Sequence, residues 1–284
     1  MRAYVPEYDL VTPDSLNEAL RLVADQARPL AGGTDLMVLF EAGKLPHRRL
    51  VSLWRIPELR GIAATKTYLT LGALTTYTEI QRSEILRREF PLLVKTASWT
   101  GAVATQNRGT LAGNIANASP AADSPPALLV YDAEIELLSA GGSRWMPYAG
   151  FHTGYKTSAL RTDEIIGHIR VPRITAGCMQ YVRKVGTRRA QAIAKVALAG
   201  LAKTKAGVVE RIRIALASVA PMPIRCLETE AALAGRKVDR AVIEEAKAKI
   251  VAEIAPITDI RSTQDYRRRV TVNLLGEFLE TLLL

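Results

Sequence analysis

Residues 107–123 read N-R-G-T-L-A-G-N-I-A-N-A-S-P-A-A-D, and the rest of the chain is organised around them. It holds two glycines, several short hydrogen-bonding side chains and a closing carboxylate, Asp123, with almost no bulk between them. Such a stretch packs poorly in a core. Glycine has no Cβ and adopts dihedral angles closed to other residues, so that backbone N–H groups can approach anionic oxygens closely. We therefore interpret these residues as one half of a ligand cradle.

The other half of the cradle is predicted at residues 31–35, which read A-G-G-T-D. Residues 28–31 have the character of a short strand, and Thr34 or Asp35 is expected to cap a helix over residues 36–41. A strand, a glycine pair and a helix start in this order form a phosphate-binding geometry. A Gly-Gly-Thr alone is a weak signal, and a plain tight turn stays an open alternative at this point.

Length and composition limit the class of protein. The chain of 284 residues suits two or three compact units. It has no apolar run of about 18 residues, and residues 1–9 lack an export signal, so we expect a cytoplasmic protein. The net charge is +10, but the basic residues fall in short groups and aromatic residues make up only 6%, which disfavours nucleic-acid binding. A docking surface for an acidic partner stays open.

The chain offers no evident catalytic or metal-binding set. The two cysteines, Cys178 and Cys226, are far apart and have no ligand spacing, so we expect neither an iron–sulfur nor a zinc site here. The histidines at 47, 152 and 168 stand in no nucleophile or metal pattern and are expected to be structural or exposed.

Hydrophobic patterning divides the chain into three units: residues 1–57, 58–175 and 176–284. The first two mix strands and helices. In them we predict helices over 15–23, 36–41, 78–88 and 90–97 and from 124, and strands over 28–31, 47–53, 69–73, 133–139 and 164–172. In the third unit three strands precede three helices, which describes an α+β unit with helices on one side of a sheet. The strands are expected over 180–185, 194–201 and 209–217, and the helices over 228–233, 240–254 and 263–284.

Taken together, the two glycine loops resemble a known family. The chain carries five motifs in the order that the family has them. They are A-G-G-T-D-L from Ala31, G-T-L-A-G-N-I from Gly109, S-P-A-A-D from Ser119, K-V-G-T-R-R-A-Q-A-I-A from Lys184 and D-I-R-S-T-Q-D-Y-R-R from Asp259. The combination resembles the FAD-binding medium subunit of the molybdenum hydroxylases, the family of xanthine dehydrogenase and aerobic carbon monoxide dehydrogenase. The resemblance covers essentially the whole chain.

The resemblance implies both a fold and a function. The fold is α+β: a two-part FAD-binding α/β region of the PCMH (vanillyl-alcohol oxidase-like) type, followed by a C-terminal domain with a three-stranded antiparallel sheet and helices. The function is that of a flavoprotein oxidoreductase subunit. Electrons would pass from [2Fe-2S] clusters on a small partner subunit through FAD on this chain to an external acceptor. Substrate would be oxidised at a molybdenum cofactor on a large partner subunit, and a dimer of heterotrimers is implied.

The resemblance also assigns cofactor-binding roles to individual residues. The pyrophosphate of FAD would lie on the backbone of the two loops. Asp35 would lie near the ribityl-phosphate, and Asp123 at the adenosine half. Ile166 would turn its backbone to the pyrimidine edge of the flavin, Lys184 would lie near the same edge, and Ile193 would pack on the ring face. The loop residues are Ala31, Gly32, Gly33, Thr34, Thr110, Gly113 and Asn114. No catalytic residue and no metal ligand is implied on this chain.

The sequence departs from the family pattern at two places. The family commonly has Gly-Gly-Asn where this chain has Ala112-Gly113-Asn114, so position 112 is expected to need no positive φ. In eukaryotic xanthine dehydrogenase-like members the segment after the Arg-Arg pair is acidic and influences the NAD site, whereas this chain has Ala190-Gln191-Ala192 after Arg188-Arg189, which puts NAD as the acceptor in doubt.

Other interpretations stay open beside the resemblance. Asp123 could simply cap the helix that starts at Ser124, and Lys184 could be a solvated strand residue. For the whole chain, the alternatives are a self-sufficient FAD-dependent oxidoreductase and a basic binding or scaffold module. The substrate, the final acceptor and the oligomeric state are left open by the sequence.

Overall fold

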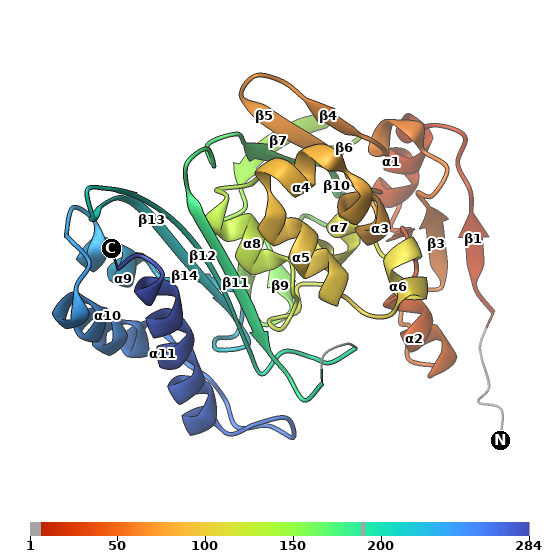
Figure 1. Ribbon diagram of the computed structural model, residues 1–284. Coiled ribbons are helices and arrows are strands. Elements are labelled where there is room, and N and C mark those ends of the chain that lie inside the picture. The colour runs from red at the N-terminus through yellow and green to blue at the C-terminus, as the bar shows by residue number, and fades with distance from the viewer. Residues whose placement is uncertain (1–6, 189–190, 284) are drawn as a thin grey trace.

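The fold was analysed in a computed structural model, which describes residues 7–188 and 191–283. Its strands form three larger sheets, which follow one another along the chain, and one short hairpin. Figure 1 shows the N-terminal sheet at one end of the molecule and the C-terminal sheet with its helices at the other.

The N-terminal sheet is parallel, with the strand order β1-β3-β2. Helix α1 packs Leu20 and Val23 into the core, and Ser15 caps it by accepting a hydrogen bond from the Glu18 N–H at 3.2 Å. Helix α2 follows the first glycine loop and has no buried residue. The bounds are β1 Asp9–Val11, α1 Leu16–Ala24, β2 Arg28–Leu30, α2 Leu36–Glu41 and β3 Arg49–Ser52.

The middle sheet is antiparallel, with the order β4-β5-β10-β6-β7. Strand β10 is central, and its burial alternates because one face looks into the core. The bounds of the sheet strands are β4 Ile62–Ala64, β5 Tyr68–Gly72, β6 Glu134–Ser139, β7 Gly142–Pro147 and β10 Ile165–Pro172. A short helix, η1 Pro57–Leu59, precedes the sheet in the chain. The hairpin of β8 His152–Gly154 and β9 Thr157–Ser158 lies between β7 and β10 in the chain.

Six helices lie between β5 and β6 in the chain. The predicted helix over 78–88 is in fact two helices, because Ser83 has an extended ψ of 116° and its hydroxyl accepts the Leu86 N–H at 3.4 Å, which starts a new helix. Thr76 begins the first of them with a capping box with Glu79. The bounds are α3 Tyr77–Arg82, α4 Glu84–Glu89, α5 Pro91–Trp99, α6 Val103–Arg108, α7 Leu111–Ala116 and α8 Pro125–Val130.

The C-terminal sheet has four strands in the order β11-β12-β13-β14, so the expectation of three strands was wrong by one. The missed strand, β14, has only two residues, too few for a period of two to be read from the sequence. The bounds are β11 Met179–Val185, β12 Val196–Lys205, β13 Val208–Ala217, β14 Ile224–Arg225, α9 Leu227–Leu233, α10 Arg240–Glu253 and α11 Gln264–Glu280.

The C-terminal sheet is covered on both faces. Leu198 and Ile214 belong to the core shared with α10 and α11, whereas Ala199 and Leu201 belong to the core of the preceding unit. In Figure 1, β12 and β13 run between α8 on one side and α10 and α11 on the other. The C-terminal helices lie on one face, as predicted, and the preceding unit covers the other.

Candidate cofactor site

The two glycine loops lie against each other in the structure. Gly32 contacts the backbone of Arg108 and Gly109 so closely that no side chain could be placed there. The second loop is held in turn by the segment before α3, because the Leu111 N–H donates to the Thr75 carbonyl at 3.0 Å and the Tyr77 N–H to the Gly109 carbonyl at 3.2 Å. Segments about 75 residues apart in the sequence therefore form one surface at the end of strand β2.

The first loop presents unused backbone donors. Within the described residues, no hydrogen bond uses the N–H groups of Gly32, Gly33, Thr34 or Asp35. Gly33 has a φ of +76°, the left-handed conformation that glycine adopts without strain. Successive free N–H groups on such a turn form a concavity that suits the oxygens of a diphosphate. The donors present therefore fit the pyrophosphate of FAD.

Asp35 does not cap helix α2, contrary to the sequence expectation. Its backbone is helical, and its side chain makes no capping hydrogen bond. Instead its carboxylate accepts from the Asn117 side chain at 3.1 Å, and the amide oxygen of Asn117 accepts from the Lys156 ammonium at 2.9 Å. Asp35 thus ties the first loop to the end of α7. Thr34 does not cap the helix either, because the N-cap position, directly before the first helical residue, is occupied by Asp35.

The second loop contains the short helix α7. Thr110 is its N-cap and accepts the Gly113 N–H at 3.0 Å. Ala112 lies inside this helix without a positive φ, as expected, and its methyl group packs into the core. Gly113 is exposed, so its missing side chain leaves the outer surface of the turn open. The side-chain oxygen of Asn114 is buried without a partner in the described part of the chain.

Asp123 and Lys184 form a buried ion pair. The Lys184 ammonium donates to Asp123 Oδ2 at 2.7 Å, and the two side chains are 9% and 10% exposed. Burial raises the pKa of the Asp123 carboxyl to about 6, although the nearby Lys184 ammonium opposes the shift. Ser124, and not Asp123, is the N-cap residue of α8. The solvated-lysine and N-cap alternatives therefore do not describe these two residues.

The pair bears on the roles that the resemblance implies for these two residues. Asp123 was expected at the adenosine half of FAD and Lys184 at the pyrimidine edge of the flavin, which are far apart in an extended cofactor. The structure joins the two side chains, so a ligand that reached one of them would lie beside the other as well. Asp123 Oδ1 is buried and has no protein partner in the described residues, which leaves a strong acceptor available.

Unpaired polar atoms gather around the second loop. Among the described residues, the oxygens of Asn114 and Asp123 noted above are buried without hydrogen-bond partners, and Ser124 Oγ and Tyr77 OH are buried near each other without a hydrogen bond of good geometry. The Tyr77 ring lies directly against Gly109. Unsatisfied buried polar groups are costly, so their accumulation at one place indicates a site that a polar ligand completes. Neither Tyr77 nor Ser124 is predicted as a site residue from the sequence, because neither belongs to a motif.

The two isoleucines differ in their surroundings. Ile166 is 5% exposed and its side chain belongs to the core, so any contact with a ligand would have to come through its backbone, which lies next to an irregularity in β10. Ile193 lies before β12 and is 52% exposed, which is unusual for a large aliphatic side chain. No described contact joins Ile193 to the glycine loops. Arg189 and Ala190, in the same connection, lie outside the described residues.

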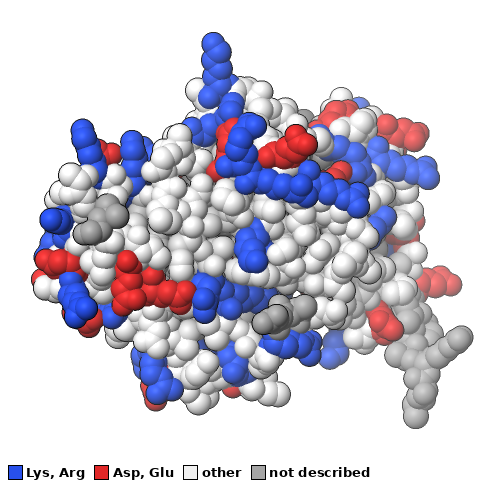
Figure 2. Space-filling model, viewed as in Figure 1, with Lys and Arg blue, Asp and Glu red and all other residues white. Residues whose placement is uncertain are grey.

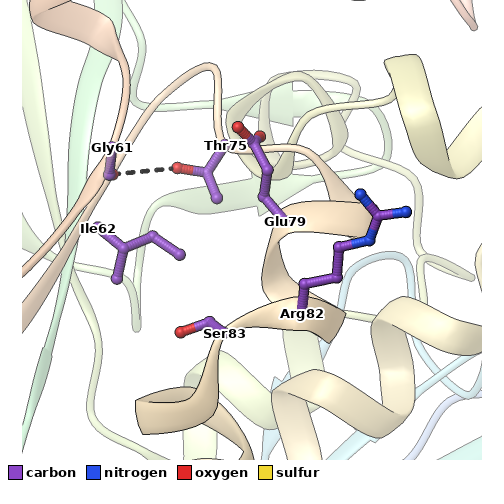
Figure 3. Close-up of a pocket in the computed structure, with 6 residues that line it drawn as sticks. All are labelled: Gly61, Ile62, Thr75, Glu79, Arg82 and Ser83. Atoms are coloured by element: carbon purple, nitrogen blue, oxygen red, sulfur yellow. Dashed lines mark hydrogen bonds between the residues drawn. The ribbon is translucent and has the colours of Figure 1, made fainter.

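A separate hollow of about 350 Å³ lies between the β4–β5 hairpin and α3 (Figure 3). Thr75 donates weakly to the Gly61 carbonyl across it, at 3.4 Å. The carboxylate of Glu79 is already used, because it accepts from the N–H and the hydroxyl of Thr76, each at 2.7 Å. The glycine loops, with the unused N–H groups of residues 32–35, remain the candidate cofactor site.

Basic residues serve the fold at several places. Arg144, Arg170 and Arg173 form ion pairs with Glu164, Glu134 and Glu89 at 2.6–2.7 Å. Figure 2 shows Lys and Arg side chains over several parts of one face, with Asp and Glu among them. The described residues contain no group of three or more His, Cys, Asp or Glu side chains arranged to hold a metal, and no helix there is long and apolar enough to span a bilayer.

Comparison with known families identifies the class of protein. Residues 6–174 match the model of the FAD binding domain in molybdopterin dehydrogenase, and residues 181–282 match that of the CO dehydrogenase flavoprotein C-terminal domain. The chain therefore belongs to the family of FAD-binding subunits of molybdenum hydroxylases, and is a flavoprotein oxidoreductase subunit.

Individual relatives span nearly the whole chain. It is 32% identical to the glyceraldehyde dehydrogenase medium chain of Sulfolobus acidocaldarius, over 94% of this chain and 95% of that one. It is 31% identical to a putative xanthine dehydrogenase FAD-binding subunit of Escherichia coli, over 89% and 88%. Its structure is similar to a chain of the carbon monoxide dehydrogenase from Hydrogenophaga pseudoflava, with a TM-score of 0.93, 30% identity and 96% of both chains covered. The resemblance drawn from the motifs is thereby confirmed.

Proposed function

We propose that this chain holds FAD between its two glycine loops and passes electrons through it, from [2Fe-2S] clusters on a small partner subunit to an external acceptor. The observation that carries the proposal is the meeting of the loops around unused N–H groups and unpaired buried oxygens. FAD, when bound, supplies the redox chemistry, and the protein fixes its position and surroundings.

The residues of the chain take distinct parts in this binding. The backbone of residues 31–34 would donate to the pyrophosphate, with Thr110, Gly113 and Asn114 beside it, where Gly113 leaves room because it has no side chain. The Asp123–Lys184 pair would meet one polar region of the cofactor through the free Oδ1. Ile166 would contribute backbone groups at the flavin edge. Ile193, being exposed, would cover a ring face, where contact with the flavin buries its apolar surface.

We infer the surrounding assembly from the family. Relatives of this chain are named medium chains, a name that implies larger and smaller companion subunits. We propose a large molybdenum-cofactor subunit, a small iron–sulfur subunit and a dimer of such heterotrimers in the cytoplasm. The division at residues 57 and 175 is proposed as well, supported by one larger sheet in each range.

Flavin binding is tested by absorption spectroscopy of the full chain. After incubation with FAD and removal of unbound cofactor, the protein is expected to keep the flavin absorption bands in stoichiometric amount. Protein that stays colourless after this treatment would contradict the proposal. An organic substrate that reduces the flavin of the isolated chain would also contradict it, because a chain that only transfers electrons has no such activity.

The assembly is tested by purifying the native complex through this chain. We expect two further subunits to copurify, with molybdenum and iron present on metal analysis. A native complex that contains neither metal would overturn the assignment of the partners, even if FAD were bound.

A further inference from the structure

We propose that Arg267 is a positioning residue for the FAD site: one guanidinium holds both the connection that carries Ile193 and the segment that carries Asp123. This inference rests on the proposed function. Arg267 belongs to the motif D-I-R-S-T-Q-D-Y-R over residues 259–267, which the cofactor site described above does not use. It lies in α11, on the far side of the C-terminal sheet from α8 (Figure 1).

The Arg267 guanidinium bridges three separate segments. It is 3% exposed, and its Nη1 donates to the carbonyls of Lys195, at 3.0 Å, and Ser218, at 2.8 Å. Its Nη2 donates to Asp259 Oδ1 at 2.7 Å. The Nε–H is buried without a partner among the described residues. A buried arginine with an unsatisfied donor is a costly way to anchor a helix, which suggests a role beyond stability.

The contact with Lys195 fixes the base of the β11–β12 connection. The Lys195 N–H donates to the Val185 carbonyl at 2.8 Å, so residues 185 and 195 close a loop. Lys184, the partner of Asp123, precedes one end of this closure, and Ile193 lies two residues before the other. The carbonyl of Lys195 points the opposite way, to Arg267. A single side chain thus sets the position of the strand pair from which both residues project.

The contact with Ser218 reaches the second glycine loop. Ser218 has a φ of +69°, a strained conformation for a residue other than glycine. Its N–H donates to the Pro120 carbonyl at 2.8 Å, while its own carbonyl accepts from Arg267. Pro120 stands three residues before Asp123. Strain of this kind persists only where the surroundings over-determine it, and the two hydrogen bonds supply that constraint.

Asp259 holds the guanidinium in place. Its carboxylate accepts the N–H groups of Arg261 and Ser262 at 2.9 and 3.1 Å, besides the Arg267 side chain. Burial by itself raises the pKa of Asp259, but the hydrogen bonds from Arg261 and Arg267 outweigh it and lower this pKa to about 2. The carboxylate therefore stays ionised, and the contacts within the motif fix the position of the Arg267 guanidinium.

The test compares Arg267→Lys with Arg268→Lys in the full chain. Lysine at 267 keeps the charge but is a single point donor that cannot hold two carbonyls and Asp259 in one plane. Arg268 is the matched control, since its side chain is 41% exposed and its partner among the described residues is Asp265, within its own helix. For Arg267→Lys we expect the dissociation constant of FAD to rise about tenfold or more, and for Arg268→Lys less than about twofold.

A second readout separates positioning from general stability. Visible circular dichroism of the flavin, recorded with every site saturated, reports the asymmetry of the ring's surroundings; it is expected to change for Arg267→Lys and not for Arg268→Lys. Asp259→Asn, which keeps the two carbonyl contacts, should raise the dissociation constant about threefold and serves if Arg267→Lys does not fold.

The outcomes are distinct. If Arg267→Lys lowers only the melting temperature, while FAD affinity and the flavin spectrum match those of the control, Arg267 is merely structural and the inference is overturned. If Asp259→Asn leaves both the FAD affinity and the flavin spectrum unchanged, the inference is likewise overturned. If the unaltered chain binds no FAD, the proposed function fails and not this inference alone.

Discussion

Gly32 lies against the backbone carbonyl of Arg108, and a Cβ on Gly32 would stand 1.7 Å from that oxygen. The contact joins the two glycine loops with no side chain between them. It also explains why the first loop needs glycine at position 32. The reason is the close approach of the Arg108 backbone, and not a positive φ. Gly33, the next residue, needs glycine for the other reason, with its φ of +76°.

The two glycines should therefore respond differently to alanine. Gly32→Ala must push the loops apart and is expected to lower the free energy of unfolding by about 3 kcal/mol or more and to prevent FAD retention. Gly33→Ala, whose Cβ would meet only side chains at 3.4 Å or beyond, should cost about 1 kcal/mol. Urea unfolding of the two variants checks this difference, and equal losses would contradict it.

Gly113 and Ala112 form a second matched pair. Gly113→Val would crowd Thr110 Oγ1, which lies 2.8 Å from the site of a new Cβ, and would cover the open turn, so flavin retention is expected to be lost. Ala112→Gly restores the common family residue and removes only a buried methyl group, so FAD should be retained, with a loss of about 1 kcal/mol in stability. Flavin absorbance after gel filtration distinguishes them; retention by Gly113→Val would argue against this loop as the cradle.

The Asp123–Lys184 pair should make stability depend on pH. The folded-state pKa of Asp123 is about 6, above the unfolded value of 3.8, so the folded chain binds the extra proton between these values. The contribution of Asp123 to the free energy of unfolding is therefore highest below about pH 4, and it falls by roughly 2–3 kcal/mol as the pH rises through 6. Urea unfolding of the flavin-free chain, compared with Asp123→Asn across pH 4–7, isolates the contribution. An identical pH profile for both proteins would refute it.

A buried network of charged side chains joins the C-terminal sheet to the end of α8, and we expect it to contribute to stability. Arg225 donates to Asp132 Oδ1 at 2.7 Å and to Glu230 Oε2 at 2.9 Å, and Glu230 also accepts the Ile214 N–H at 2.8 Å. Arg225→Ala leaves the Glu230 carboxylate buried without its main partner and is expected to cost about 3–5 kcal/mol. Arg213→Ala is the control, because its side chain is more exposed and it contacts Glu230 only at 3.9 Å; it should cost about 1 kcal/mol or less. Thermal melts compare the two.

Much of the fold was predictable because local patterns dominate it. The helices after Ser15 and Thr263 start at side chains that accept a backbone N–H three residues on, a rule readable from the sequence. The break at Ser83 and the strand β14 were not predicted, because an extended serine inside a helical pattern and a two-residue strand leave no periodic signal. The second cover of the C-terminal sheet also escaped prediction, since a strand buried on both faces does not reveal what packs on each.

The class of this protein can be identified from its motifs alone. Its glycine loops, their order and the later motifs identified the family, because glycine positions and short polar runs are imposed by a backbone that approaches a ligand. Only the tertiary structure decided how those motifs act together. It placed Gly32 on Arg108, joined Asp123 to Lys184 and gave Arg267 two carbonyls to hold. Contacts between residues tens of positions apart depend on how the sheets pack, and no local pattern records that packing.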